Sequence, residues 1–134
     1  MTRDDGSILP LTIAYALIAL AAILVCVDAT SLYLTQKRLD GWADAAALAA
    51  ADEFTLEVSS GEPHARLTDA DVARGAAALL ASAGAAAVVV TAASPDGTSA
   101  RVTLADTWRP PVLTLFVPDG IALQSTATSR SALR

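Results

Sequence analysis

The sequence predicts an α+β protein in which a long N-terminal transmembrane helix continues into a small domain, where one more helix accompanies a three-stranded antiparallel sheet. The sequence does not decide whether a fourth strand joins this sheet. Three observations predict this class: an uncharged apolar run over residues 8–27, an Ala-rich stretch behind it, and short alternating segments between turns in the C-terminal half. We expect residues 1–54 to hold a short leader, the span and its extension, and residues 55–134 to form the domain.

The composition excludes several functional classes. The 134 residues carry a net charge of −5 without a long basic cluster, so a nucleic-acid partner is not expected. One Cys and one His are too few for a disulfide or a zinc site. His64 lies in a polar stretch, and no Ser has a nucleophile motif around it. We therefore expect no enzymatic activity, no cofactor and no small-molecule substrate.

The uncharged run from Ile8 to Val27 matches the thickness of a membrane. Twenty helical residues extend about 30 Å, which is the depth of a bilayer's hydrocarbon core. Pro10 falls in the first turn, where its missing N–H costs little, and Cys26 is interpreted as an apolar side chain within the membrane. Membrane lipid is therefore an expected partner. The few flanking charges do not define the orientation of the span.

Two other interpretations of the chain remain open. Val27-Asp28-Ala29 loosely fits a signal-peptidase site, which would release a secreted soluble binding module. Against this, the apolar run is longer than the usual core of a signal peptide, and only Arg3 precedes it. The other alternative is a membrane-tethered accessory domain of an enzyme.

The helix is expected to continue past Asp28 to about Phe54, because helix formers are dense there. Gly41 could kink it. Small residues repeat at a spacing that lets a second helix approach closely, either at Gly41, Ala45 and Ala49 or at Ala43, Ala47 and Ala51. These residues are the candidate packing surface. Asp44, which lies among them, is expected in solvent unless an assembly buries it.

The N-terminal third resembles a known family. Asp5-Gly6-Ser7, the apolar run that closes on Asp28, Tyr33 and the block Ala43-Asp44-Ala45-Ala46-Ala47-Leu48-Ala49-Ala50-Ala51 are similar to the TadE/TadG-like pilus-assembly proteins of tight-adherence (Flp-type) systems. The resemblance implies a pilin-like protein anchored in the cytoplasmic membrane, with its domain outside the cytoplasm. It also implies other pilin-like subunits or secretion proteins as partners, and a role in building a pilus or a related secretion apparatus.

The same resemblance makes Gly6-Ser7 a candidate leader junction, because prepilin leaders typically end in Gly before a long apolar helix. Pilin-like substrates usually have Glu at the fifth mature position, and here that position is Leu11. A freed amine would lack an internal carboxylate partner in the membrane. We therefore expect the leader to be retained, which an intact-mass measurement would test.

The C-terminal domain opens with a stretch of loop composition over 57–66. Thr68 and Asp71 form a predicted capping box, so a helix should run to about Ser82 and end at Gly84. We expect this helix to bury Val72, Leu79 and Leu80.

The strands of the domain follow that helix. Alternation predicts strands over 86–93 and 100–108 around a turn at 94–97, and a third over 121–129. The apolar run 112–117 fits a strand or a short helix, and the family resemblance favours a helical crossover. A domain this small needs the long helix to complete its core.

Overall fold

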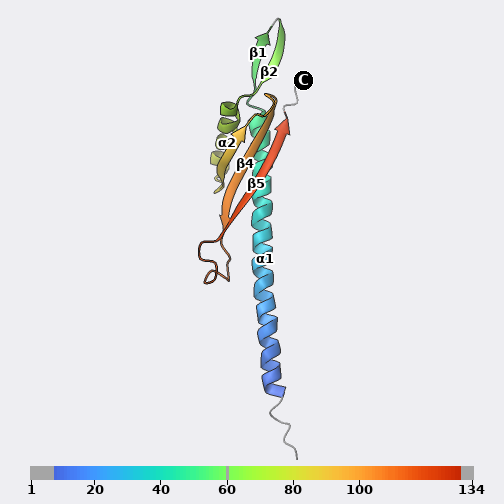
Figure 1. Cartoon of the computed structure of the whole chain (residues 1–134), viewed down its shortest axis with the longest axis vertical. Coiled ribbons are helices and arrows are strands. Elements are labelled where there is room, and N and C mark those ends of the chain that lie inside the picture. Colours follow the sequence, from blue (N-terminus) through green and yellow to red (C-terminus); the bar gives the residue numbers. More distant parts are fainter. Residues whose placement is uncertain (1–7, 60, 131–134) are drawn as a thin grey trace, which may run out of the picture.

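The computed structural model describes residues 8–59 and 61–130, and it confirms the α+β class. A long helix, α1 (Ile8–Ala51), is followed by a two-stranded hairpin, β1 (Thr55–Ser59) and β2 (Glu62–Arg66). A second helix, α2 (Asp69–Ala83), leads into three strands, β3 (Val88–Ala93), β4 (Ser99–Trp108) and β5 (Ile121–Arg130). Figure 1 shows that these elements gather around the C-terminal half of α1, while its N-terminal half projects away from them.

The helix α1 is one uninterrupted rod of 44 residues, about 66 Å long at 1.5 Å per residue. It passes through Gly41 without a break, so the kink considered from the sequence does not occur. It ends at Ala51, three residues before the predicted end at Phe54. One stripe of this rod faces the domain: Leu39 and Ala43 are buried, and Leu32 and Gln36 are half-buried.

The helix α2 has the predicted ends. The Thr68 hydroxyl accepts a hydrogen bond from the backbone N–H of Asp71, and the Asp71 carboxylate accepts one from the backbone N–H of Thr68. Gly84 adopts the left-handed conformation that ends the helix at Ala83, one residue past the prediction. Val72 and Leu80 are buried, as expected, whereas Leu79 is only half-buried and packs against the outside of the core.

The three C-terminal strands form an antiparallel sheet in the order β3-β4-β5. The central strand, β4, alternates as its sequence indicates, with Val102 and Leu104 fully buried and Arg101 exposed. The predicted turn between β3 and β4 is present, and Gly97 provides its positive φ of 74°. No fourth strand joins this sheet in the described part of the chain.

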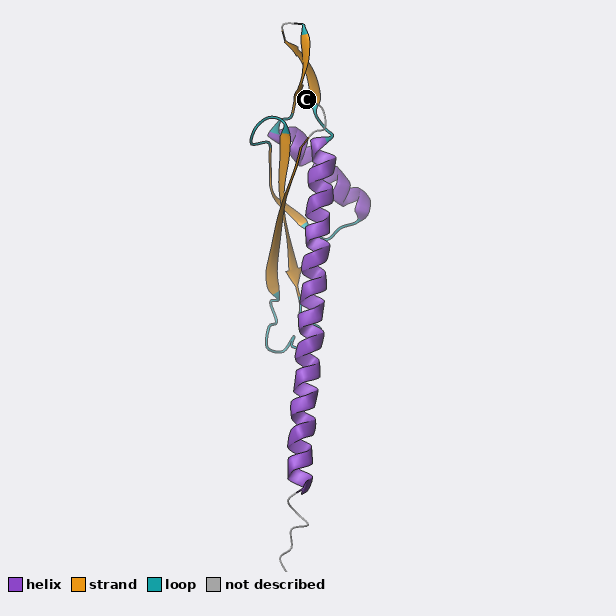
Figure 2. Ribbon diagram, turned by 90° about the vertical axis from the view of Figure 1, so that its right-hand side faces the viewer, coloured by secondary structure: helices purple, strands orange, loops and turns teal. Residues whose placement is uncertain are grey.

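The core lies between α1, α2 and the sheet. In Figure 2 the sheet lies along one side of α1, and α2 crosses the C-terminal part of the rod. The buried cluster combines Leu39 and five alanines of α1 with Val72 and Leu80 of α2 and with Val102 and Leu104 of β4. The expectation that the long helix completes the small core is therefore confirmed.

The segment 57–66 is not the loop that its composition suggested. It lies in the hairpin β1-β2, in which Leu56 pairs with Ala65 and Glu57 pairs with His64. The Gly61 turn has a φ of 88°, which a glycine adopts without strain. Alternation of apolar and polar residues was visible over only five positions of β1, and Pro63 in β2 weakened the signal for a strand. Neither hairpin strand forms an extended contact with any element other than its partner.

The segment 112–117 is not the helical crossover that the family resemblance favoured. It forms a single turn, in which the backbone N–H groups of Phe116 and Val117 both donate to the carbonyl of Leu113. Prolines at 110, 111 and 118 enclose only six residues, too few for a stable helix. The segment is an exposed loop between β4 and β5.

Candidate membrane and subunit interface

The N-terminal part of α1, residues 8–27, is an apolar stem that touches little else in the described chain. Every residue in it is exposed except the half-buried Leu24. Its large side chains are among the most exposed hydrophobic groups of the molecule, with Ile8 at 73% and Leu17 at 61%. Within the described residues, α1 is the one helix long and apolar enough to cross a membrane. An apolar surface of this size is unfavourable in water and favourable in lipid.

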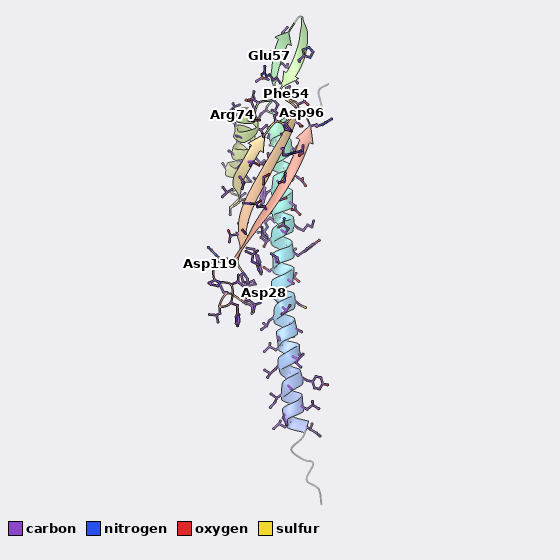
Figure 3. The ribbon with its side chains drawn as sticks, viewed as in Figure 1. Asp28, Phe54, Glu57, Arg74, Asp96 and Asp119 are labelled. Atoms are coloured by element: carbon purple, nitrogen blue, oxygen red, sulfur yellow. The ribbon has the colours of Figure 1, made fainter. Side chains whose placement is uncertain are left out.

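The stem ends at Asp28, where the first contact with the C-terminal half occurs. Asp28 is 5% exposed, and its Oδ1 accepts a hydrogen bond of 3.2 Å from the backbone N–H of Val112. Its Oδ2 is buried and has no partner among the described residues. Three residues further on, the Ser31 hydroxyl accepts a hydrogen bond of 3.1 Å from the indole N–H of Trp108. Figure 3 shows the 109–120 loop beside Asp28, at the end of the sheet nearest the stem.

A polar seam joins the middle of α1 to β5. The carboxylate of Asp40 accepts hydrogen bonds from the Ser125 hydroxyl at 2.8 Å and from the Gln36 amide at 2.9 Å. The Gln36 amide also donates to the backbone carbonyl of Gln124 at 3.2 Å. The hydrogen bond from Ser125, followed by that from Gln36, lowers the pKa of Asp40 below its usual value. These bonds set the position of β5 along the rod.

The Ala-rich part of α1 is largely covered within the chain. Ala43, Ala47 and Ala51 are at most 1% exposed and belong to the core. The helix α2 comes so close at Gly75 that a Cβ there would lie 2.8 Å from the Cα of Ala50 and 3.2 Å from the carbonyl oxygen of Ala49. Small residues near the C-terminal end of α1 therefore allow a close helix contact within the chain.

The opposite side of the same helix is uncovered. Leu34, Gly41, Ala45 and Leu48 follow one another at intervals of seven, four and three residues, which places them on one side of the helix. We call these four residues the outer stripe. Leu34 and Leu48 are each 58% exposed, Gly41 is exposed and Ala45 is half-buried. Asp44 is exposed beside the stripe.

The candidate packing residues thus separate into two groups. Ala43, Ala47 and Ala51 face the core of their own chain, and the half-buried Ala49 lies near α2. Gly41, Asp44 and Ala45 retain surface that another subunit could contact. The sequence could not separate the groups, because alanines occur on several sides of this part of the helix. The other candidate, the junction Gly6-Ser7, lies outside the described residues.

The titratable residues do not form a clustered site in the described ranges. His64 is exposed on β2, and no group of three His, Cys, Asp or Glu side chains there could hold a metal ion. Cys26 is an exposed residue of the stem. The sequence analysis missed the contact of Asp28 with the loop, and the only available signal was the position of this lone carboxylate at the end of the apolar run.

These features define a class of protein, one whose apolar helical stem continues into a rod that carries a small α+β body. Residues 6–53 match the model of the Tad family, described as putative Flp pilus-assembly TadE/G-like. The match covers the stem and the Ala-rich rod, and it confirms the resemblance found in the sequence. This match supports the interpretation that the chain is a component of pilus assembly. Comparisons with curated proteins and with solved structures give no significant match.

Proposed function

We propose that this chain is a membrane-anchored, pilin-like structural and assembly component of a Tad/Flp-type pilus or a related secretion apparatus. It crosses the cytoplasmic membrane once through residues 8–27, and residues 55–134 lie outside the cytoplasm. Its partners are membrane lipid and other pilin-like subunits or assembly proteins. The role is structural rather than enzymatic.

One observation carries the proposal. The matched segment 6–53 contains the whole of α1, whose first half is exposed and apolar and whose second half packs against the described body. A helix built in this way can hold a body at a fixed distance from the bilayer. Because the outer stripe stays uncovered, the same helix can contact a second subunit while it holds its own body.

The structure also favours an anchored chain over a secreted module. Cleavage after Ala29 would cut α1 within the rod and would remove Asp28 from the backbone N–H of Val112. The new N-terminus would begin one residue before Ser31, which accepts the hydrogen bond from Trp108. A released module would therefore lose a contact that positions the β4-β5 loop.

The test places a charge in the stem. Arg in place of Ala19, near the middle of the span, should cost about 2.5–3.5 kcal/mol of insertion free energy. We expect Ala19→Arg to lower the amount of protein that stays with membranes after a high-salt wash. The matched control is Ala78→Arg, because Ala78 is an exposed residue of α2 and the charge change is the same. Wild-type chain in the medium, beginning at Thr30, would instead support the secreted module.

A further inference from the structure

The β4-β5 loop carries the most exposed apolar side chains of the described molecule. Leu115 is 93% exposed and Phe116 is 81% exposed, more than any large apolar side chain of the stem. Residues 110–118 contain no charge, and the nearest charged residues are Arg109 and Asp119. Two neighbouring large apolar groups held this far into solvent indicate a contact that the isolated chain does not make.

The loop is held at one particular height along α1. The hydrogen bond from the backbone N–H of Val112 to Asp28 fixes it at the first residue after the uncharged run. The bond between Trp108 and Ser31 fixes the end of β4 three residues higher. In Figure 3 the loop forms the end of the body nearest the stem. If the stem spans a bilayer, this height is the boundary between hydrocarbon and water.

The loop also satisfies several of its own polar groups, as lipid contact requires. The backbone N–H groups of Phe116 and Val117 donate to the carbonyl of Leu113. The Thr114 hydroxyl donates to the carbonyl of Pro110 at 3.0 Å, and the three prolines of the segment have no N–H. Backbone groups without partners are costly near hydrocarbon, so these bonds reduce the cost of shallow insertion.

We propose that Leu115 and Phe116 insert into the interfacial layer of the same bilayer that α1 spans, so that the body contacts the membrane at a second point. The inference rests on the proposed membrane anchor. A helix and a loop that both enter the bilayer restrict the rotation and tilt of the body relative to the membrane. The loop would then set the angle at which the outer stripe faces neighbouring subunits.

The experiment measures lipid contact at single positions of the full-length chain. Cys26→Ser removes the only native thiol, and Leu115→Cys is then labelled with the fluorophore NBD. The chain is reconstituted into phosphatidylethanolamine–phosphatidylglycerol vesicles that contain nitroxide-labelled lipids as quenchers. Leu17→Cys, in the stem, is the reference for lipid. Leu56→Cys, an exposed apolar position 63% accessible on the hairpin at the far end of the body, is the reference for water.

We expect a blue-shifted emission at Leu115→Cys and a loss of intensity with quenchers placed near the headgroups. Leu17→Cys should be quenched most by quenchers deep in the acyl chains, and Leu56→Cys by neither. If Leu17→Cys reports lipid while Leu115→Cys behaves like Leu56→Cys, the loop contact is wrong and the anchor stands. If Leu17→Cys reports water as well, both proposals fail. Because Leu115 is almost fully exposed, its replacement leaves the folded contacts in place.

Discussion

Gly75 occupies the point of closest approach between α2 and α1. A Cβ at this position would lie 2.8 Å from the Cα of Ala50 and 2.9 Å from the Cγ of Glu53. We expect Gly75→Ala to lower the free energy of unfolding, because overpacking costs about 1–3 kcal/mol. The better helix propensity of Ala offsets about 1 kcal/mol of that cost. Thermal unfolding of the monomer in detergent, followed by circular dichroism, measures the difference.

The matched control for this substitution is Gly41→Ala in α1. Gly41 is exposed, and nothing lies within 4 Å of the place where its Cβ would be. Ala should therefore raise the stability of the rod by up to about 1 kcal/mol. Opposite signs for the two substitutions are expected. Equal stabilisation by both would mean that α2 does not approach α1 as closely as described.

Asp96 makes the turn between β3 and β4 sensitive to pH. Its Oδ1 accepts hydrogen bonds from the Ser99 hydroxyl and the Ser99 backbone N–H, each at 2.6 Å, and from the Thr98 backbone N–H at 3.0 Å. These bonds hold the pKa of Asp96 well below its usual value, and the bond from the Ser99 hydroxyl contributes most. The ionised carboxylate therefore favours the folded state.

The sign of the pH effect follows from this lowered pKa. The stabilisation is complete above the pKa of an unfolded Asp, about 3.9, and is lost as the pH falls toward the lower folded-state pKa. We expect Asp96→Asn to be less stable than the wild type at pH 7, with a difference that shrinks below about pH 4. Urea unfolding at a series of pH values tests this. A difference that stays constant down to pH 2 would contradict the assigned role of the carboxylate.

At the scale of elements, the hairpin β1-β2 is separate from the core. Its strands pair with each other and make no extended contact with the other elements. Leu56 and Val58 are largely exposed on it, whereas Leu67, directly after the hairpin, is 3% exposed. The hairpin therefore contributes little to the stability of the body.

This separation predicts the effect of a deletion. Thr55 and Arg66 are paired, so the two ends of the hairpin lie close together and a short Gly-Ser linker can join Phe54 to Leu67. We expect this variant to unfold at nearly the wild-type temperature. The contrasting substitution is Leu67→Ala, which should cost about 2–5 kcal/mol because it removes a buried side chain. A large loss of stability in the deletion variant would show that the hairpin supports the core.

The same elements show how far the sequence alone could go. The capping box at Thr68, the turn at Gly97 and the alternation of β4 are local patterns, and each predicted the correct element. The predictions for the hairpin and for 112–117 were wrong for different reasons. The alternation of β1 is short and Pro63 weakened the strand signal of β2, whereas the 112–117 loop depends on a distant contact. The loop is enclosed by prolines and held by Asp28, a residue 84 positions away, and no local pattern reports such a contact.

For the candidate interface, the spacing of small residues indicated α1 but could not assign its faces. Small residues occur on all sides of α1 between Gly41 and Ala51, so spacing alone allowed two packing surfaces. The position of α2 decides between them within the chain, because it covers the side that contains Ala50. The outer stripe is defined only by what the folded body leaves uncovered.

At the scale of the whole molecule, the rod presents two faces with different tasks. One face carries the body, and the outer stripe is the surface we propose for contacts with a neighbouring subunit. Gly41 is the position at which a neighbouring helix could come closest. We expect Gly41→Leu to reduce crosslinking between subunits in membranes, because the larger side chain would separate the two helices.

The substitution tests assembly without disturbing the fold. Leu is a better helix former than Gly, and the space around Gly41 is open, so the monomer should keep its thermal stability in detergent. Ala78→Leu, on the exposed side of α2, adds a similar apolar side chain away from the outer stripe and should leave the crosslinks unchanged. If crosslinks persist in Gly41→Leu and disappear in Ala78→Leu, subunits meet through α2 instead. The open face of the rod would then be covered by lipid or left in water.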